Sequence, residues 1–111
     1  MTNETQLIQQ GDVLIFTNAK LPDDAQEVQP INGRLILAEG ETTGHAHAAN
    51  VMEYPGTKLF KSAQGLFLSV IAPIEIQHEE HKKVRVPAGV HKIGIVQEVD
   101  PFADEVKNVQ D

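Results

Sequence analysis

Glycine and proline interrupt this sequence so often that only short elements fit between them. The chain of 111 residues has 8 glycines and 6 prolines, and brief apolar runs lie between the turns that they mark. Val13–Phe16 is the first such run, rich in branched and aromatic residues and followed by the turn-prone pair Thr17-Asn18. Residues 30–33, Pro-Ile-Asn-Gly, form another turn signal. This punctuation predicts a protein built from short β-strands.

Alternating and apolar segments predict the other strands and set the fold class. Between His45 and Tyr54 both sets of alternate residues are partly apolar, which indicates a strand covered on both sides. Many short strands with turns between them predict an all-β domain, a small antiparallel β-sandwich or barrel. The further strands are expected at residues 34–38, 57–61, 66–72, 74–78, 84–86 and 90–99, with a hairpin between the second and third of these.

The two ends of the chain differ from its middle. Residues 1–10 are polar apart from Leu7 and Ile8, which predicts a flexible N-terminus followed by a single β domain over residues 11–111. Asp100-Pro101 is a good helix start, with Asp as N-cap and Pro as the first residue. We therefore expect a short C-terminal helix that rests on the sheet.

Composition excludes several kinds of chemistry. The chain has no cysteine, so disulfides, thiolate metal ligands and cysteine nucleophiles are absent. Its formal net charge of −7 argues against binding a nucleic-acid backbone, which requires clustered Lys and Arg. The longest apolar run, residues 66–72, is far shorter than the roughly 20 residues of a membrane helix. We expect a cytoplasmic protein that binds neither nucleic acid nor membrane.

Histidines carry the clearest chemical signal in the sequence. His45 and His47 are separated by one residue, so both side chains project from the same face of an extended strand. His78 and His81 form a second pair, in His-Glu-Glu-His. Imidazole nitrogens bind divalent first-row metals without help from sulfur. The two pairs therefore predict a metal site, provided that the fold brings them together.

His78 and His81 can reach one site only if the chain changes direction between them. Ile74, Ile76 and His78 share one face of a strand, which points His78 inward, whereas His81 has the opposite parity. We therefore expect a bulge or tight turn at Glu79-Glu80. The alternative is that these histidines are ordinary strand and turn residues on a solvated surface.

Other polar residues extend this set or compete with it. His91 lies on an apolar face after Pro87-Ala88-Gly89 and is more typical of a hydrogen-bonded core or edge histidine than of a ligand. Glutamates near the pairs are candidate oxygen ligands or acceptors for the distal ring N–H groups. These glutamates are Glu39, Glu41, Glu53, Glu79 and Glu80.

Part of the sequence resembles the two motifs of cupins. The similar residues are Gly40, His45, His47, Glu53 and Gly56, and then Pro87-x-Gly89-x-His91. The resemblance implies a cupin-like β-barrel whose metal is held by His45, His47, Glu53 and His91. The sequence departs from the cupin pattern because the gap before Glu53 is longer and His91 comes one residue early. The pattern also has no place for His78 and His81.

A closer resemblance, which spans most of the chain, is to a small uncharacterised family of bacterial and phage proteins. Its signatures are Gly-Asp-Val-Leu, Glu-Gly-Glu-x-Thr-Gly-His-x-His, His-Glu-Glu-His and Pro-Ala-Gly. In this chain they are residues 11–14, 39–47, 78–81 and 87–89. The resemblance favours His45, His47, His78 and His81 as ligands and implies no activity.

These observations predict a small metal-binding β protein whose biochemical activity is unassigned. The ligands are His45, His47, His78 and His81, and the ion is a divalent transition metal such as Zn, Ni, Fe or Mn. One alternative is a cupin-like metal-dependent enzyme that acts on a small molecule, with Glu79 or Glu80 as general base. Another is a phage or host protein-interaction module without a functional metal. A small-molecule ligand and a homo-oligomer are the partners to consider.

Overall fold

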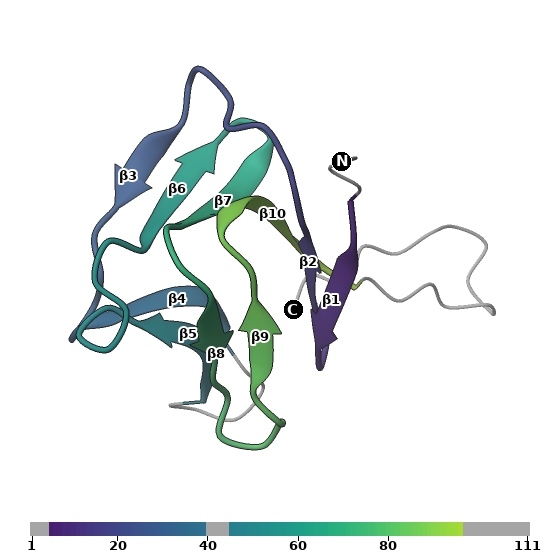
Figure 1. Cartoon of the computed structure of the whole chain (residues 1–111), viewed down its shortest axis with the longest axis vertical. Helices are drawn as coiled ribbons and strands as arrows, with labels where there is room; N and C mark the ends of the chain where they lie inside the picture. The colour runs from purple at the N-terminus through teal and green to yellow at the C-terminus, as the bar shows by residue number, and fades with distance from the viewer. Residues whose placement is uncertain (1–4, 40–44, 97–111) are drawn as a thin grey trace, which may run out of the picture.

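A computed structural model of the chain describes residues 5–39 and 45–96, and this part contains ten β-strands and no helix (Figure 1). The all-β prediction is confirmed, and the predicted C-terminal helix lies outside the described residues. No helix in the described part is long and apolar enough to cross a membrane. The strands are β1 (Leu7–Gln10), β2 (Val13–Phe16), β3 (Gln26–Val28), β4 (Arg34–Glu39), β5 (Ala46–Asn50), β6 (Lys58–Ser62), β7 (Gly65–Val70), β8 (Ile74–Ile76), β9 (Val84–Val86) and β10 (Gly89–Ile95).

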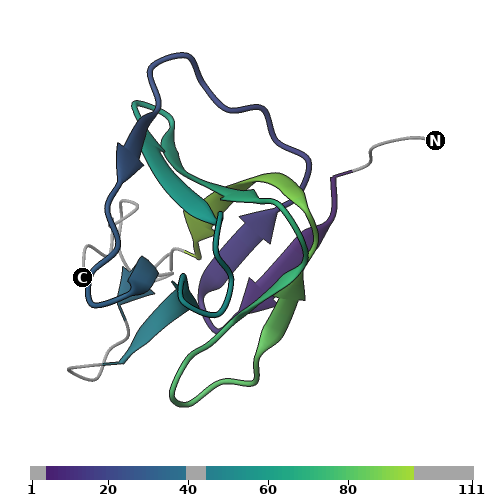
Figure 2. The same ribbon diagram turned by 60° about the vertical axis from the view of Figure 1, so that its left-hand side comes forward.

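The strands form one large antiparallel sheet and two hairpins. Six strands pair in the order β1-β2-β10-β7-β6-β3, β4 pairs with β5, and β8 pairs with β9. An isolated bridge between Ala48 and Gln77 links the β4–β5 hairpin to the end of β8. Figures 1 and 2 show that the β8–β9 hairpin lies beside the β1–β2 hairpin. The elements thus enclose one interior, as the predicted sandwich or barrel requires.

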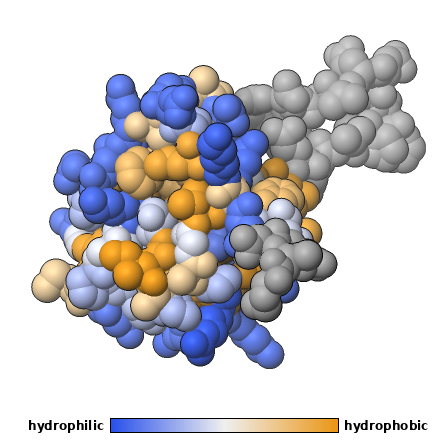
Figure 3. Space-filling view, turned by 45° about the horizontal axis from the view of Figure 1, so that its top comes forward, coloured by the Kyte–Doolittle hydropathy of each residue, from blue (hydrophilic) through white to orange (hydrophobic). Residues whose placement is uncertain are grey.

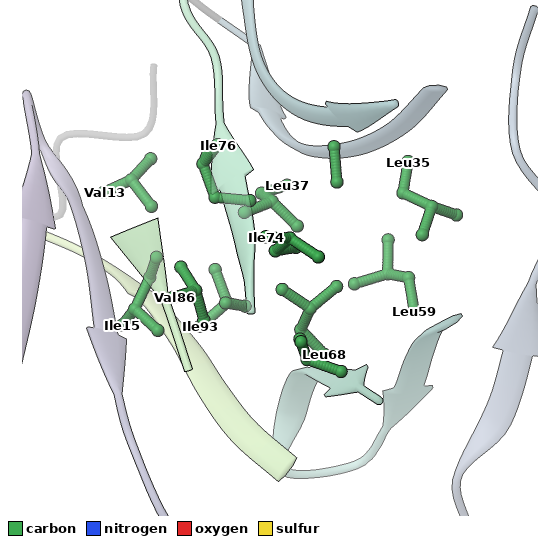
Figure 4. Packing of buried hydrophobic residues seen from close by; sticks show 12 residues of the cluster. Val13, Ile15, Leu35, Leu37, Leu59, Leu68, Ile74, Ile76, Val86 and Ile93 are labelled. Carbon is green, nitrogen blue, oxygen red and sulfur yellow. The ribbon is translucent and has the colours of Figure 1, made fainter. Parts of the chain in front are cut away.

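Branched aliphatic side chains fill this interior. On β2, Val13 and Ile15 are fully buried while Leu14 and Phe16 are partly exposed, as expected of alternating side chains. Figure 4 shows residues of the large sheet facing residues of the hairpins. Removing each such side chain from water contributes about 1.5–3 kcal/mol. The buried cluster consists of Val13, Ile15, Leu35, Leu37, Ala49, Leu59, Leu68, Val70, Ile74, Ile76, Val86 and Ile93.

The N-terminal part differs from the prediction. The sequence predicts a flexible start up to residue 10, whereas residues 7–10 form β1 and pair with β2. Ile8 packs against the core and Gln10 is only 2% exposed. The inward-facing residue at the end of β1 is a glutamine, Gln10, so the sequence lacks the apolar residue that would indicate a strand there. The strand β3, which pairs with β6 at the edge of the sheet, is also missed, because its exposed residues Gln26 and Glu27 are polar.

The strand predicted from His45 to Tyr54 is shorter in the structure, where β5 includes His47 but not His45. β5 ends at Asn50 because its side-chain oxygen accepts hydrogen bonds from the backbone N–H groups of Met52 (2.8 Å) and Glu53 (3.3 Å). This local turn is typical of asparagine. Residues 46–49 are buried, so the expectation of a strand covered on both sides is confirmed.

Some large apolar side chains remain on the surface. Figure 3 shows hydrophobic residues gathered in the middle of one face and hydrophilic residues around them. Exposed apolar side chains are common on folded domains. The most exposed are Leu7, Ile31, Met52, Ile71, Ile95 and Val96.

Candidate metal centre

Strand register brings one histidine of each pair together. Ala48 and Gln77 exchange two backbone hydrogen bonds, of 3.0 and 2.9 Å, so they form a hydrogen-bonded antiparallel pair. One step along this register, His47 lies opposite His78 in the non-hydrogen-bonded position, where side chains approach most closely. The centroids of the two rings are 4.3 Å apart.

A bend after β8 adds His81 to this pair. The chain leaves the strand at His78 and bends over Glu79, Glu80 and His81, where the sequence requires a change of direction. The His81 ring lies 4.5 Å from that of His78 and 5.6 Å from that of His47, measured between centroids. The predicted turn between the two histidines is therefore present.

Three of the four predicted histidines form a compact group. One ring nitrogen from each of His47, His78 and His81 lies within 4.8 Å of the others, and we call these residues the triad. His45 is not a member, since its ring centroid is 5.9 Å from that of His78 and its Nδ1 lies 3.6 Å from the Glu80 carboxylate. Residues two apart on one strand are separated by about 6.8 Å, whereas cross-strand neighbours are closer.

Gln10 fixes the orientation of His47. The Gln10 amide nitrogen donates to the carbonyl oxygens of Ile76 (3.0 Å) and Lys82 (2.8 Å), so its oxygen must face the other way. That oxygen lies 2.8 Å from Nδ1 of His47 and accepts its proton. Nε2 of His47 is then left unprotonated in the neutral ring. A hydrogen bond of this kind to the distal nitrogen is typical of metal-binding histidines.

The surroundings of His47 favour its neutral form. Burial, and then the neighbouring His78, lower the pKa of His47 below 6.5, although Asp12 opposes this. Nε2 of His47 lies 3.5 Å from the Asp12 carboxylate, so a lone pair faces a negative charge. A cation between Nε2 of His47 and the Asp12 carboxylate would remove the repulsion between this lone pair and the negative charge. The neutral ring is also the form that binds metals.

Gly11 leaves room for His81, a member of the triad. Gly11 has φ of +59° in the turn between β1 and β2, and a Cβ there would lie 2.6 Å from Nε2 of His81. Any other residue would therefore be strained and would also push the imidazole away. The turn closes one side of the triad.

His78 has a backbone partner that a metal would have to replace. The N–H of Glu80 donates to Nδ1 of His78 over 3.0 Å, so the proton of the neutral ring is on Nε2. A metal on Nδ1 takes that lone pair, and a metal on Nε2 moves the proton to Nδ1. Either route removes this hydrogen bond, at a cost of about 1 kcal/mol.

The two glutamates predicted as general bases have different surroundings. Oε1 of Glu79 accepts a hydrogen bond from the N–H of Ala46 (2.9 Å), and Oε2 lies 3.9 Å from Arg34. The Ala46 hydrogen bond is the largest of the influences that lower the pKa of Glu79, which makes it a weak base. Glu80 is exposed and lies nearest to His45.

The ligand set implied by the cupin resemblance is not assembled. His91 is fully buried; its Nδ1 accepts from the N–H of Asn18 (3.3 Å) and its Nε2 donates to the carbonyl of Pro87 (2.6 Å). Both ring nitrogens are thus occupied, as expected of a core histidine. Glu53 lies in the exposed turn after β5. Of the other candidate glutamates, Glu41 lies outside the described residues.

Sequence reasoning overlooked three residues of the β1–β2 hairpin that surround the triad, namely Gln10, Gly11 and Asp12. The signal was weak but present. Gln10 shares the parity of Ile8, and an amide that faces a core needs several hydrogen-bond partners. Gly11 belongs to the Gly-Asp-Val-Leu signature, but its closeness to His81 depends on the fold.

Together, the fold and the site define a small all-β domain with a three-histidine cluster suited to metal binding. The chain belongs to the family described as a domain of unknown function (DUF8820), which matches residues 9–95. This span contains the triad as well as Gln10, Gly11 and Asp12. No curated protein and no solved structure matches the chain.

Proposed function

We propose that this domain binds a divalent transition metal through His47, His78 and His81. The observation that carries the proposal is the grouping of three imidazole nitrogens within 4.8 Å. Nitrogens bound to zinc at 2.0–2.1 Å lie about 3.3 Å apart in a tetrahedral site, so the rings have to close by at most about 1.5 Å. Side-chain rotation in the exposed bend supplies a movement of that size.

The neighbours of the triad support the same proposal. Gln10 holds Nδ1 of His47, which leaves Nε2 for the metal. Asp12 supplies a nearby negative charge that favours a bound cation. His45 is a fourth ligand only if it rotates toward the others. Imidazole ligands favour Zn, Ni, Cu or Fe over Mn, which prefers oxygen.

A metal-dependent enzyme acting on a small molecule is the second candidate. Three protein ligands leave a coordination position open, and open sites are typical of catalytic metals, whereas structural sites are closed by four ligands. His78 and His81 also line a cleft, so the open position would be accessible. A bound metal would supply Lewis-acid chemistry or an activated water. Glu80 is the remaining candidate base, because the hydrogen bond from Ala46 lowers the pKa of Glu79.

The test is metal analysis of the purified, untagged chain. We expect close to one equivalent of Zn, Ni or Fe after incubation and dialysis, and loss of that metal in His47→Ala, His78→Ala double variants. Lys61→Gln, which changes an exposed residue of β6, is the control for handling and should retain the metal. Absence of metal from the parent would contradict the proposal and favour the alternative of a protein-interaction module.

A further inference from the structure

A cleft beside the triad differs in charge from the rest of the molecule. It encloses about 250 Å³, and His78 and His81 form part of its wall. Its other polar lining residues are Arg34, Asn50, Gln77, Glu79 and Lys83. Arg34 and Lys83, two cationic residues, therefore line the same cleft in a chain whose net charge is −7.

The one acidic residue in the lining, Glu79, offsets only one of the two positive charges. One oxygen of Glu79 accepts the Ala46 N–H over 2.9 Å, and the other lies 3.9 Å from Arg34, which is beyond hydrogen-bond distance. A guanidinium has five N–H donors, so Arg34 retains donors for another anion. Lys83 has no ion pair within residues 5–39 and 45–96.

The size of the cleft limits its ligand. Pockets for drug-sized molecules usually measure about 300–1,000 Å³, so this one suits something smaller. A nucleic-acid strand needs a long basic surface, which an acidic chain with two cations in one cavity does not provide. Arg and Lys recognise carboxylates and phosphates through charge-assisted hydrogen bonds.

We infer that the cleft binds a small molecule with a carboxylate or phosphate group, held by Arg34 and Lys83 next to the triad. The inference deepens the proposed function and rests on it, because the metal would provide a further positive charge and an open coordination position at the wall of the cleft. The amides of Asn50 and Gln77 would supply additional hydrogen bonds to the ligand.

Calorimetric titration of the zinc-loaded full chain tests this inference. The probes are succinate and inorganic phosphate, with succinamide as the neutral analogue of succinate. We expect one or both anions to bind and succinamide not to bind. Lys83→Gln should weaken anion binding about fivefold, and the Arg34→Gln, Lys83→Gln double variant about tenfold or more. Which anion binds more tightly distinguishes a carboxylate from a phosphate ligand.

Controls separate this inference from the metal site itself. Lys61→Gln removes the same charge at an exposed residue that does not line the cleft, and it should leave anion affinity unchanged. All variants should retain zinc, since none alters the triad. A parent that binds zinc but neither anion, or an affinity that is equal in the parent and the Lys83→Gln variant, would overturn the assignment of the cleft alone. A parent that binds no zinc would overturn the proposed function and with it this inference.

Discussion

At the scale of single residues, Gln10 decides which nitrogen of His47 faces the triad. Its amide can be oriented in only one way, because two backbone carbonyls accept its two N–H groups. The imidazole of His47 therefore donates from Nδ1 and presents Nε2. Gln10, whose polar side-chain atoms all have hydrogen-bond partners, thus orients His47 without being a candidate ligand itself.

Replacing Gln10 should weaken metal binding without removing a ligand. Gln10→Ala leaves Nδ1 of His47 without its acceptor, and loss of such a hydrogen bond typically reduces metal affinity by about 10–100-fold. It should also lower the free energy of unfolding by about 1–3 kcal/mol, because buried polar groups lose their partners. Competition with a chromogenic chelator measures the first effect and urea denaturation the second.

The neighbouring residue provides the control for Gln10. The Gln9 side chain is exposed, and within the described residues it donates to the carbonyl oxygen of Gly11 (2.9 Å). Gln9→Ala should leave both metal affinity and stability close to those of the parent. Equal metal affinity in the two variants would show that Gln10 does not orient His47.

The lowered pKa of His47 makes stability depend on pH in a defined direction. Burial and His78 place this pKa below 6.5, so the unfolded chain takes up the proton first as the pH falls. The free energy of unfolding of the metal-free chain is therefore fully retained above about pH 6.5 and decreases as the pH falls toward the lower folded-state pKa. We expect urea denaturation at pH 7.5 and 5.5 to show a larger decrease in the parent than in a His47→Asn variant. A parallel decrease in both proteins would contradict this assignment.

At this scale the sequence predicted the members of the histidine cluster better than their surroundings. His47, His78 and His81 were identifiable because imidazole has few roles besides proton transfer, hydrogen bonding and metal binding. Gln10 and Asp12 were not, because polar residues near a terminus are usually solvated. His45 was included because sequence parity shows which face a side chain occupies, but not its distance from residues on another strand.

At the scale of elements, the turn between β1 and β2 acts as one wall of the site. Gly11 combines a positive φ with close approach to His81. Gly11→Ala should therefore lower stability by about 1–2 kcal/mol through backbone strain and also reduce metal affinity by displacing the imidazole. Thermal denaturation and chelator competition measure these two effects.

Gly33 provides the control that separates backbone strain at a positive φ from displacement of the His81 imidazole. It also has a positive φ, of +78°, but the nearest side-chain atom to a Cβ there is Cγ of Met52 at 3.7 Å. Gly33→Ala should lower stability by a similar amount and leave metal affinity unchanged. Metal affinity that stays at the parental level in Gly11→Ala would show that His81 adjusts freely.

Elements were predictable where apolar residues mark them. β2 and the β6–β7 hairpin appear in the sequence as apolar runs between turns, and the structure has them. β1 and β3 escaped prediction because each is short and has few apolar residues, namely Leu7 and Ile8 in β1 and Val28 in β3. The bridge between Ala48 and Gln77 also could not be predicted, because it joins residues that no local turn connects, yet it brings the triad together.

At the scale of the whole molecule, the triad exists only in the folded chain. His47 belongs to β5, while His78 and His81 follow β8, and Gln10 reaches them from β1. Unfolding separates these elements, so the unfolded chain offers isolated histidines that bind metals weakly. Metal binding and folding are therefore linked, since a ligand that binds only the folded form stabilises it.

This linkage predicts a metal-dependent melting temperature. At a free metal concentration 100 times the Kd, the free energy of unfolding should rise by about 2.7 kcal/mol, which corresponds to an increase in Tm of about 10 °C. His81→Ala, which removes an exposed ligand, should melt near the metal-free parent and show little increase. Ile15→Val, in the core, should lower Tm with and without metal, because it costs about 0.5–1.5 kcal/mol in both states. Scanning calorimetry of the three proteins, with zinc and with excess chelator, measures each shift. An equal increase in the parent and in His81→Ala would place the stabilising metal elsewhere than at the triad.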